Sequence, residues 1–351
     1  MLKKLAVWFL DFLLINSITL MLVGIIFGVT IGKPSNIKHW LNDSKIYTAA
    51  INNALEEAKK SPDSATLGQP EVQEAIRNTI TPQVAQSTVE QVIDGTYHWL
   101  EGKAVKPDFR IDLTSLKASF AEQAGNAAVK RVSALPVCSF AQLRQLGTDP
   151  DPFETPCKPA GINLDTVKKQ VSDKVFGNDS ILKDPVVTVD TLKSKDGEQP
   201  FYQKASRLPD AYRWASKMSW IFGGLSVLLA AAIIWISSDH RKATKKLARS
   251  LLISGILLVA SVLIVKWFSD KLIATKVKLS NDISDELRAS ITLAIKLATN
   301  SINQALLITG GVFTALSGGT LVYLRLTNKK TPRTDVPEPS QKATKSEPPK
   351  S

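Results

Sequence analysis

Cys138 and Cys157 are the only cysteines of this 351-residue chain, and the chemistry that they can do depends on the compartment they face. A zinc site would need further cysteine or histidine ligands, and the chain has only three histidines, dispersed in sequence. A redox pair typically shows C-x-x-C spacing, whereas 18 residues separate these two cysteines. Outside the cytoplasm two cysteines in one domain usually pair, and closing this loop would contribute roughly 3 kcal/mol. The pattern therefore predicts a structural disulfide if this segment is extracytoplasmic.

The other reactive residue types show no spacing that selects a catalytic set. The sequence contains no G-x-S-x-G, H-E-x-x-H, Walker A or G-x-G-x-x-G pattern. Asp94, His98 and Glu101 could share one face of a helix and hold a cation, although an exposed polar face is the commoner explanation for such residues. We expect no catalytic, cofactor-binding or metal-binding residue and no bound cofactor.

Four apolar runs must position the cysteine segment relative to a membrane. They cover residues 5–31, 218–237, 247–268 and 305–324. Each is long enough to cross a hydrocarbon core of about 30 Å as a helix. The first run begins like a signal peptide, but it exceeds the usual 7–15 apolar residues and lacks a small-x-small cleavage site, so we interpret it as an anchor. Asp11 within it is either an intramembrane carboxylate or, as we favour, a residue at the headgroup level.

Positive charge in short flanking segments sets the orientation of such a protein. With four spans, the N-terminus, the loop between the second and third spans and the C-terminal tail share one side. These segments carry 14 Lys/Arg against four Asp/Glu, so this side should be the cytoplasm. The residues predicted to set the topology are Lys3, Lys4, Arg241, Lys242, Lys245, Lys246 and Arg249. The sequence thus predicts a multi-pass plasma-membrane protein with both termini inside and both cysteines outside.

The predicted fold is that of a mainly α membrane protein, with four transmembrane helices and a largely helical extracytoplasmic domain that contains a small two-stranded β element. The predicted segments are 1–31 (N-terminus and first span), 32–217 (extracytoplasmic domain), 218–268 (second and third spans with their basic loop), 269–304 (extracytoplasmic amphipathic helix), 305–325 (fourth span) and 326–351 (disordered basic tail). Residues 33–213 carry 23 Lys/Arg and 23 Asp/Glu, so the net charge of +12 lies mostly in the flanks. This distribution argues against nucleic acid as a partner and favours contact of the flanks with the lipid bilayer.

Helical spacing within the extracytoplasmic domain predicts helices over residues 44–61, 69–80, 81–102, 114–135 and 164–176. Thr81 and Asp165 are the predicted caps of two of them, and Gly102 is a predicted stop. Residues 108–113 and 185–192 alternate as strands do, and we expect them to pair because a lone strand leaves its ladder unpaired. We expect the helices that begin near Pro209 and residue 281 to run unbroken into the second and fourth spans. The large domain should cover the amphipathic segment, with the membrane surface as the rival cover.

Small residues repeat every four positions in two of the spans, at Gly24, Gly28 and Gly32 and at Gly311, Ala315 and Gly319. This spacing lets helices approach closely. It predicts either a seam between copies of the chain, which would make the protein a homo-oligomer, or packing among the four spans of one chain, which we favour.

The stretches "VIDGTYHWLEGK", "FRIDLTSLK", "LPVC…PCKP" and "RLPDAYRWAS" resemble a group of uncharacterised bacterial four-span membrane proteins with a large, disulfide-containing first extracytoplasmic domain. The resemblance covers most of residues 1–326 and implies no activity. The architecture favours a non-enzymatic envelope protein whose outer domain binds a protein or surface component. A membrane-bound enzyme acting on envelope lipid or wall polymer and a transport accessory subunit are the alternatives.

Overall fold

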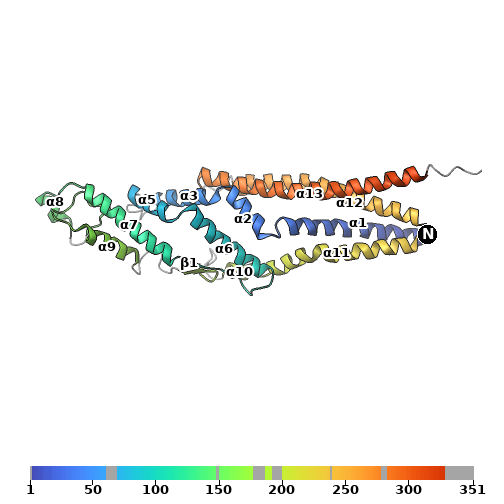
Figure 1. Ribbon diagram of the computed structural model, residues 1–351, viewed down its shortest axis with the longest axis horizontal. Coiled ribbons are helices and arrows are strands. Elements are labelled where there is room, and N and C mark those ends of the chain that lie inside the picture. The colour runs from blue at the N-terminus through green and yellow to red at the C-terminus, as the bar shows by residue number, and fades with distance from the viewer. Residues whose placement is uncertain are drawn as a thin grey trace, which may run out of the picture.

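The computed structural model describes residues 2–60, 69–147, 150–176, 186–191, 200–237, 239–277 and 283–328. The molecule is elongated, with four long helices at one end and a domain of shorter helices at the other (Figure 1). The long helices are α1 (Leu2–Val29), α11 (Leu208–Ile236), α12 (His240–Leu272), which continues into the π-helical turn η1 (Ile273–Val277), and α13 (Asp285–Asn328). All four are long and apolar enough to cross a membrane, in agreement with the four predicted spans.

The shorter elements form what we call the helical domain. Its helices are α2 (Pro34–Asp43), α3 (Ile46–Lys60), α5 (Pro70–Thr79), α6 (Pro82–Leu100), α7 (Thr114–Ala134), α8 (Phe140–Gln145), α9 (Leu164–Phe176) and α10 (Phe201–Lys204). Its strands are β1 (Arg110–Asp112) and β2 (Val186–Thr188). The five helices expected from periodicity are present, and α2, α8 and α10 were not predicted. The fold prediction of a mainly α chain with one two-stranded element is confirmed.

The four long helices pack as a bundle in which α1 contacts each of the other three. Leu14, Ile18, Leu22 and Ile26 of α1 recur every four residues, so they form one buried stripe along the helix. This stripe meets buried aliphatic residues from the other three helices, namely Ile233, Leu258 and Leu306. One stripe of the apolar helix α1 therefore packs inside the bundle, while other apolar residues of the same helix are exposed on the outside of the bundle.

Helices α12 and α13 form the other tight pair of the bundle, and two glycines set their separation. A Cβ atom on Gly255 would lie 2.5 Å from Oγ1 of Thr314 and 2.9 Å from the carbonyl oxygen of Gly310. Likewise a Cβ atom on Gly310 would lie 2.9 Å from the carbonyl oxygen of Gly255. Only residues without a side chain fit at this crossing, because real Cβ atoms do not approach so closely.

Two helices run without a break from the helical domain into the bundle, as expected. Helix α11 begins at Leu208, and α13 begins at Asp285 beside α3. The amide nitrogen of Ser284 donates to Oδ1 of Asn53 at 2.6 Å, and Nδ2 of Asn52 donates to the Glu286 carboxylate at 3.0 Å. The domain therefore covers the outer part of α13, which was the favoured prediction for this segment.

The single amphipathic helix predicted over residues 269–304 is not observed as one element. Helix α12 runs past the expected end of the third span to Leu272 and continues as η1 to Val277, and α13 begins only at Asp285. Ser269 and Asp270 are polar, so they end the apolar run at residue 268, but both are compatible with a helix. Helix α12 therefore continues for four residues beyond the apolar run. The amphipathic portion is thus the first part of α13.

Helix α6 follows its sequence signals closely. The Thr81 hydroxyl accepts a hydrogen bond from the amide of Val84 at 3.3 Å, and Pro82 occupies the first helical position. Gly102 has φ of +77°, the left-handed conformation that ends a helix. Gly95 lets the chain at Asp108 cross directly over the helix, where a Cβ atom would lie 2.3 Å from the Asp108 carbonyl oxygen. This crossing leads into β1.

Strands β1 and β2 pair antiparallel, with Ile111 opposite Val187, so the predicted partnership is confirmed. Phe109, Ile111 and Val189 form a small buried cluster on one face of the pair. The alternation seen in the sequence therefore reflects one covered face and one exposed face.

The far end of the helical domain, opposite the bundle, is a unit of α5, α7 and α9 around a second core. This core contains Val72, Ala124, Ala128, Val132, Phe153, Val167 and Val171. Small residues bring α7 and α9 together: the Ser172 hydroxyl donates to the Ala121 carbonyl oxygen at 3.1 Å. The predicted cap of α9 was wrong by two positions, because Oδ1 of Asn163 accepts from the amide of Asp165 at 2.9 Å and Asp165 lies in the first turn.

Candidate functional site

The two cysteines lie at the far end of the helical domain, at disulfide distance. Their sulfur atoms are 2.11 Å apart and their Cα atoms 4.9 Å apart, and both side chains are buried. The backbone beside them is paired as well, since the Cys138 amide donates to the Lys158 carbonyl oxygen and the Lys158 amide donates to that of Pro136, both at 2.9 Å. The two ends of the loop between the cysteines are therefore fixed by covalent and hydrogen bonds together.

The body of this loop is anchored by Phe153. Oδ1 of Asp151 accepts from the Phe153 amide at 2.8 Å, which forms a local turn of the kind that aspartate favours. The Phe153 side chain enters the core between α5, α7 and α9. Pro150, Pro152 and Pro156 lie outside helices and strands, but the loop is held against the core by this aromatic residue.

Directly after Cys138 the chain forms the short helix α8, whose start is a capping box. The Ser139 hydroxyl accepts from the Gln142 amide at 3.4 Å, and Oε1 of Gln142 accepts from the Ser139 amide at 2.9 Å. The S-x-x-Q pattern of residues 139–142 is the sequence signal that would have predicted this helix.

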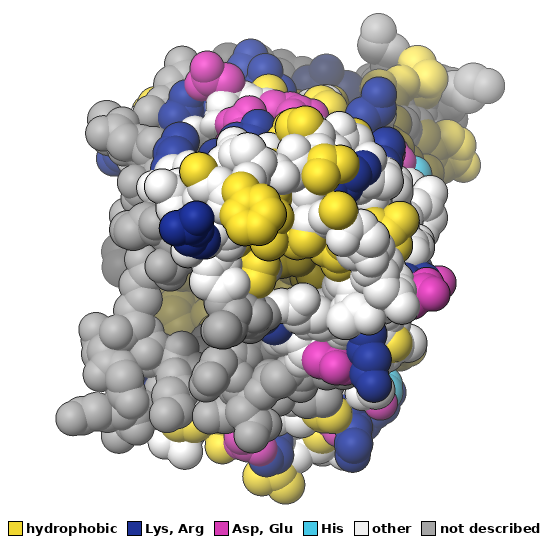
Figure 2. Space-filling model, turned by 90° about the vertical axis from the view of Figure 1, so that its left-hand side faces the viewer, with side chains coloured by type: hydrophobic (Ala, Val, Ile, Leu, Met, Phe, Trp, Pro, Cys, Tyr) yellow, Lys and Arg dark blue, Asp and Glu magenta, His cyan; other side chains and the backbone are white. Residues whose placement is uncertain are grey.

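Helix α8 and the residue before Cys138 expose apolar side chains. Phe140 is 84% exposed, and Val137 and Leu143 are 60% and 47% exposed. Phe140 and Leu143 are three residues apart and so lie on one face of α8. Figure 2 views this end of the molecule and shows hydrophobic side chains gathered near the middle of the face, with lysine and arginine side chains around them. We call Val137, Phe140 and Leu143 the apolar tip.

Charged residues lie in the chain segments that adjoin the apolar tip. Arg144 and Glu154 are exposed, and the Lys158 ammonium donates to the Ser133 carbonyl oxygen at the end of α7. Apolar and aromatic residues at the centre of a patch with charged residues at its rim are typical of protein–protein interfaces. The geometry therefore suits docking of another molecule.

The basic residues predicted to set the topology lie at the opposite end of the molecule. Lys3 and Lys4 are in the first turn of α1, while Arg241, Lys242, Lys245, Lys246 and Arg249 are exposed in the first turns of α12. Asp239 caps α12 by accepting from the amides of Arg241 and Lys242 at 3.0 and 3.4 Å. Hydrogen bonds from Lys242 lower the pKa of the Asp239 carboxyl. The C-terminal tail predicted to add basic charge lies outside the described residues, apart from the segment up to Asn328.

Of the small residues predicted to pack helices, only Gly24 lies at a close approach to another helix. A Cβ atom there would lie 2.6 Å from the Ser219 amide nitrogen on α11. The neighbours of Gly32 belong to its own turn, and Gly28, Gly311 and Gly319 have no atom within 4 Å of that position. Ala315 is exposed. The crossing of Gly255 with Gly310 was missed because it pairs one glycine from each helix rather than repeating along either one.

Polar side chains link the bundle helices near the basic end. The Ser250 hydroxyl donates to Oδ1 of Asp11 at 2.5 Å, which joins α12 to α1. Deeper in the bundle, the Ser226 hydroxyl donates to that of Ser17 at 3.0 Å, which joins α11 to α1. Asp11 thus lies level with Ser250, which follows the exposed Arg249 in α12. Its position at the headgroup level stays a prediction.

The acidic residues considered for cation binding have other partners. Asp94 pairs with Lys38 of α2 at 2.7 Å, and Glu101 pairs with Lys103 at 2.5 Å. Within the described ranges, no group of three or more histidine, cysteine, aspartate or glutamate residues is arranged to hold a metal ion.

Comparison of the chain with protein-family models, with curated protein sequences and with solved structures gave no significant match in any of the three.

Proposed function

We propose that this chain is a non-enzymatic membrane protein of the cell envelope, that its helical domain faces away from the cytoplasm, and that the apolar tip docks a protein partner. The observation that carries the proposal is the exposed Phe140 on a capped helix beside the Cys138–Cys157 bond. A large aromatic side chain that is 84% exposed makes few contacts of its own with the rest of the chain. Such residues mark interaction surfaces when they lie in a patch.

The arrangement of charge supports this orientation. The basic residues of the α12 start and the N-terminus lie at the bundle end, and the helical domain lies at the other. If the four apolar helices cross the plasma membrane, the positive-inside rule puts the bundle's basic end in the cytoplasm. The cysteine pair then faces an oxidising compartment, where a disulfide persists.

The chemistry of the apolar tip favours a protein as the partner. Aromatic residues and arginine are enriched at the energetic centres of protein interfaces, and the tip offers Phe140 with Arg144 one turn later. The capping box and the disulfide hold α8 in place before any partner arrives. Because less conformational freedom is then lost on binding, a small patch of this kind can support useful affinity.

Site-specific photocrosslinking in cells tests the proposal. A photoreactive amino acid at Phe140 should capture a discrete protein, whereas the same amino acid at the exposed Ser87 of α6 should not capture it. Phe140→Ser should remove a partner recovered by affinity purification, whereas Val105→Ser, which changes another fully exposed apolar residue, should leave it. Equal capture at residues 140 and 87, or full recovery with Phe140→Ser, would overturn the proposal.

A further inference from the structure

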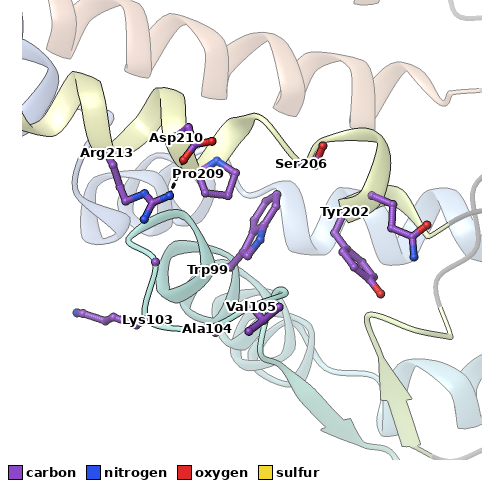
Figure 3. A pocket seen from close by; sticks show the side chains of 11 residues that line it. Trp99, Lys103, Ala104, Val105, Tyr202, Ser206, Pro209, Asp210 and Arg213 are labelled. Carbon is purple, nitrogen blue, oxygen red and sulfur yellow. Dashed lines mark hydrogen bonds and ion pairs between the residues drawn. The ribbon is translucent and has the colours of Figure 1, made fainter.

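A cavity of about 550 Å³ lies between the end of α6 and the start of α11, far from the apolar tip (Figure 3). Trp99, Lys103, Tyr202, Ser206, Asp210 and Arg213 line it. The side chains come from three segments: the end of α6, the α10 region and the first turns of α11. In Figure 3 the Trp99 ring lies between the two charged groups of α11 on one side and Tyr202 on the other. The cavity therefore has an aromatic wall and a charged wall.

The cavity lies at the level where a membrane surface would meet the molecule. Trp214, next to Arg213, and Trp235 at the other end of α11 are 68% and 89% exposed. They are 21 residues apart, which corresponds to about 32 Å along a helix and matches a hydrocarbon core of about 30 Å. Exposed tryptophans concentrate at the two membrane interfaces. Arg213 and the cavity beside it thus fall in the headgroup layer on the helical-domain side.

The cations of the cavity retain donors for a ligand. Nη2 of Arg213 lies 2.5 Å from Oδ1 of Asp210, and Nζ of Lys103 lies 2.5 Å from Oε2 of Glu101. A guanidinium has five N–H donors and an ammonium has three, so one carboxylate does not saturate either group. Glu101 does not line the cavity, whereas Lys103, Asp210 and Arg213 do. The two ion pairs balance in charge, so the cavity offers a ligand the unused N–H donors of its two cations rather than a net charge.

Gly102 allows Arg213 to lie along that wall. Its φ of +77° disfavours a side chain, and a Cβ atom there would lie 3.1 Å from Nη1 of Arg213. The nearby N-terminus of α11 has no side-chain cap, and its partial positive charge adds to that of the two side chains. The cationic part of the cavity is therefore built by both backbone and side chains.

We propose that this cavity binds the phosphate of an anionic phospholipid headgroup, with Arg213 and Lys103 as its ligands. Guanidinium and ammonium groups form strong charge-assisted hydrogen bonds to phosphate oxygens. The Ser206 hydroxyl is a further donor at the rim, and the Trp99 and Tyr202 rings face the glycerol portion. The site depends on the membrane insertion proposed above but not on the apolar tip, so loss of the protein partner would leave it intact.

Native mass spectrometry of the full chain, released from detergent with defined short-chain lipids, tests this site. We expect one phosphatidylglycerol molecule to bind more tightly than phosphatidylcholine. Arg213→Gln and Lys103→Gln should each weaken phosphatidylglycerol about tenfold or more. The matched control is Lys217→Gln, which removes an exposed cation one turn further along α11 and should change the affinity less than twofold.

Three results would overturn the inference. Unchanged phosphatidylglycerol affinity in both Arg213→Gln and Lys103→Gln would show that the lipid binds elsewhere. Equal affinity for phosphatidylglycerol and phosphatidylcholine would contradict an anionic headgroup as the ligand. Displacement of the lipid by inorganic phosphate at the lipid's own concentration would identify a soluble phosphate, rather than a headgroup, as the ligand.

Discussion

The phenolic hydroxyl of Tyr97 donates a hydrogen bond to the backbone carbonyl oxygen of Ile31, with 2.5 Å between the two oxygens. Tyr97 belongs to α6, and Ile31 follows the end of α1. The Tyr97 ring also meets the ring of Tyr212 edge-on at 5.8 Å between centroids, and the Tyr212 hydroxyl donates to the Gly32 carbonyl oxygen at 2.9 Å. Two tyrosines thus satisfy carbonyl groups just beyond α1 and tie the bundle to the helical domain.

Tyr97→Phe should lower the free energy of unfolding by about 1 kcal/mol, because the Ile31 carbonyl loses its donor while the ring packing is kept. Thermal unfolding of the detergent-solubilised chain measures this change. Tyr323→Phe, at an exposed position of α13, is the matched control and should be neutral. An equal effect of the two substitutions would contradict the role given to the Tyr97 hydroxyl.

The stability contributed by Tyr97 should depend on pH in the alkaline range. Burial, with a smaller contribution from Tyr212, raises the Tyr97 pKa from 10.0 to about 12. Between pH 10 and pH 12 the Tyr97 hydroxyl is deprotonated in the unfolded chain but still protonated in the folded chain. The free energy of unfolding therefore falls as the pH rises through this range. Unfolding curves of the wild type and Tyr97→Phe should therefore converge over this range. Parallel curves would show that the hydroxyl titrates normally.

Loss of the Cys138–Cys157 bond should destabilise the far end of the helical domain and spare the bundle. The chain-entropy estimate for this loop is about 3 kcal/mol. Hydrogen exchange of Cys138→Ser should rise in α8 and in the Asp151–Phe153 turn, with little change in α1 or α13. Mass spectrometry after alkylation under denaturing conditions should find no free thiol in the wild type purified without reductant. Free thiols at both positions would contradict the bond.

Gly255→Ala should destabilise the bundle by about 1–3 kcal/mol, because its Cβ atom would overlap Thr314 and Gly310 of α13. Gly319→Ala is the matched control, since a Cβ atom there meets no atom within 4 Å and alanine has the higher helix propensity. It should be neutral or slightly stabilising. Thermal unfolding in detergent compares the stability of the two variants. A less stable Gly319→Ala than Gly255→Ala would place the helix crossing elsewhere.

The proposed orientation predicts the labelling pattern of single cysteines in a Cys138→Ser, Cys157→Ser background. Ser87→Cys on α6 should react with an impermeant thiol reagent in intact cells, whereas Thr244→Cys on α12 should react only after permeabilisation. Both positions are exposed, so accessibility to water does not distinguish them. Labelling of Thr244→Cys alone in intact cells would invert the topology.

Local signals in the sequence predicted a large part of this fold. Thr81, Pro82 and Gly102 predicted the limits of α6, and the alternation at Phe109 and Ile111 predicted β1, because these signals act within a few residues. Uniform hydropathy predicted the four long helices for the same reason. The partner of β1 was predicted although it is distant in sequence, because a lone strand leaves its ladder unpaired and residues 185–192 were the one other predicted strand.

The features that were missed depend on pairs of residues distant in sequence. Gly255 and Gly310 form one crossing only because α12 and α13 lie in a particular register, which no repeat along either helix reveals. The cavity at Trp99 and Arg213 joins residues more than 100 positions apart, so neither side suggests the other. The apolar tip lies in a segment for which no helix was predicted, so nothing in the sequence placed Phe140 and Leu143 together on an exposed face.

The unbroken course of α11 and α13 has a mechanical consequence. Helix α13 has 44 residues, about 66 Å, and neither helix has a proline beyond its first turn at which it could hinge. A sideways load on Phe140 is therefore carried as a bending moment into the four-helix bundle, as in a beam clamped at one end. A tilt of the bundle would displace Phe140 further than residues close to the bundle. The tilt angle of the bundle therefore determines the positions that Phe140 can occupy.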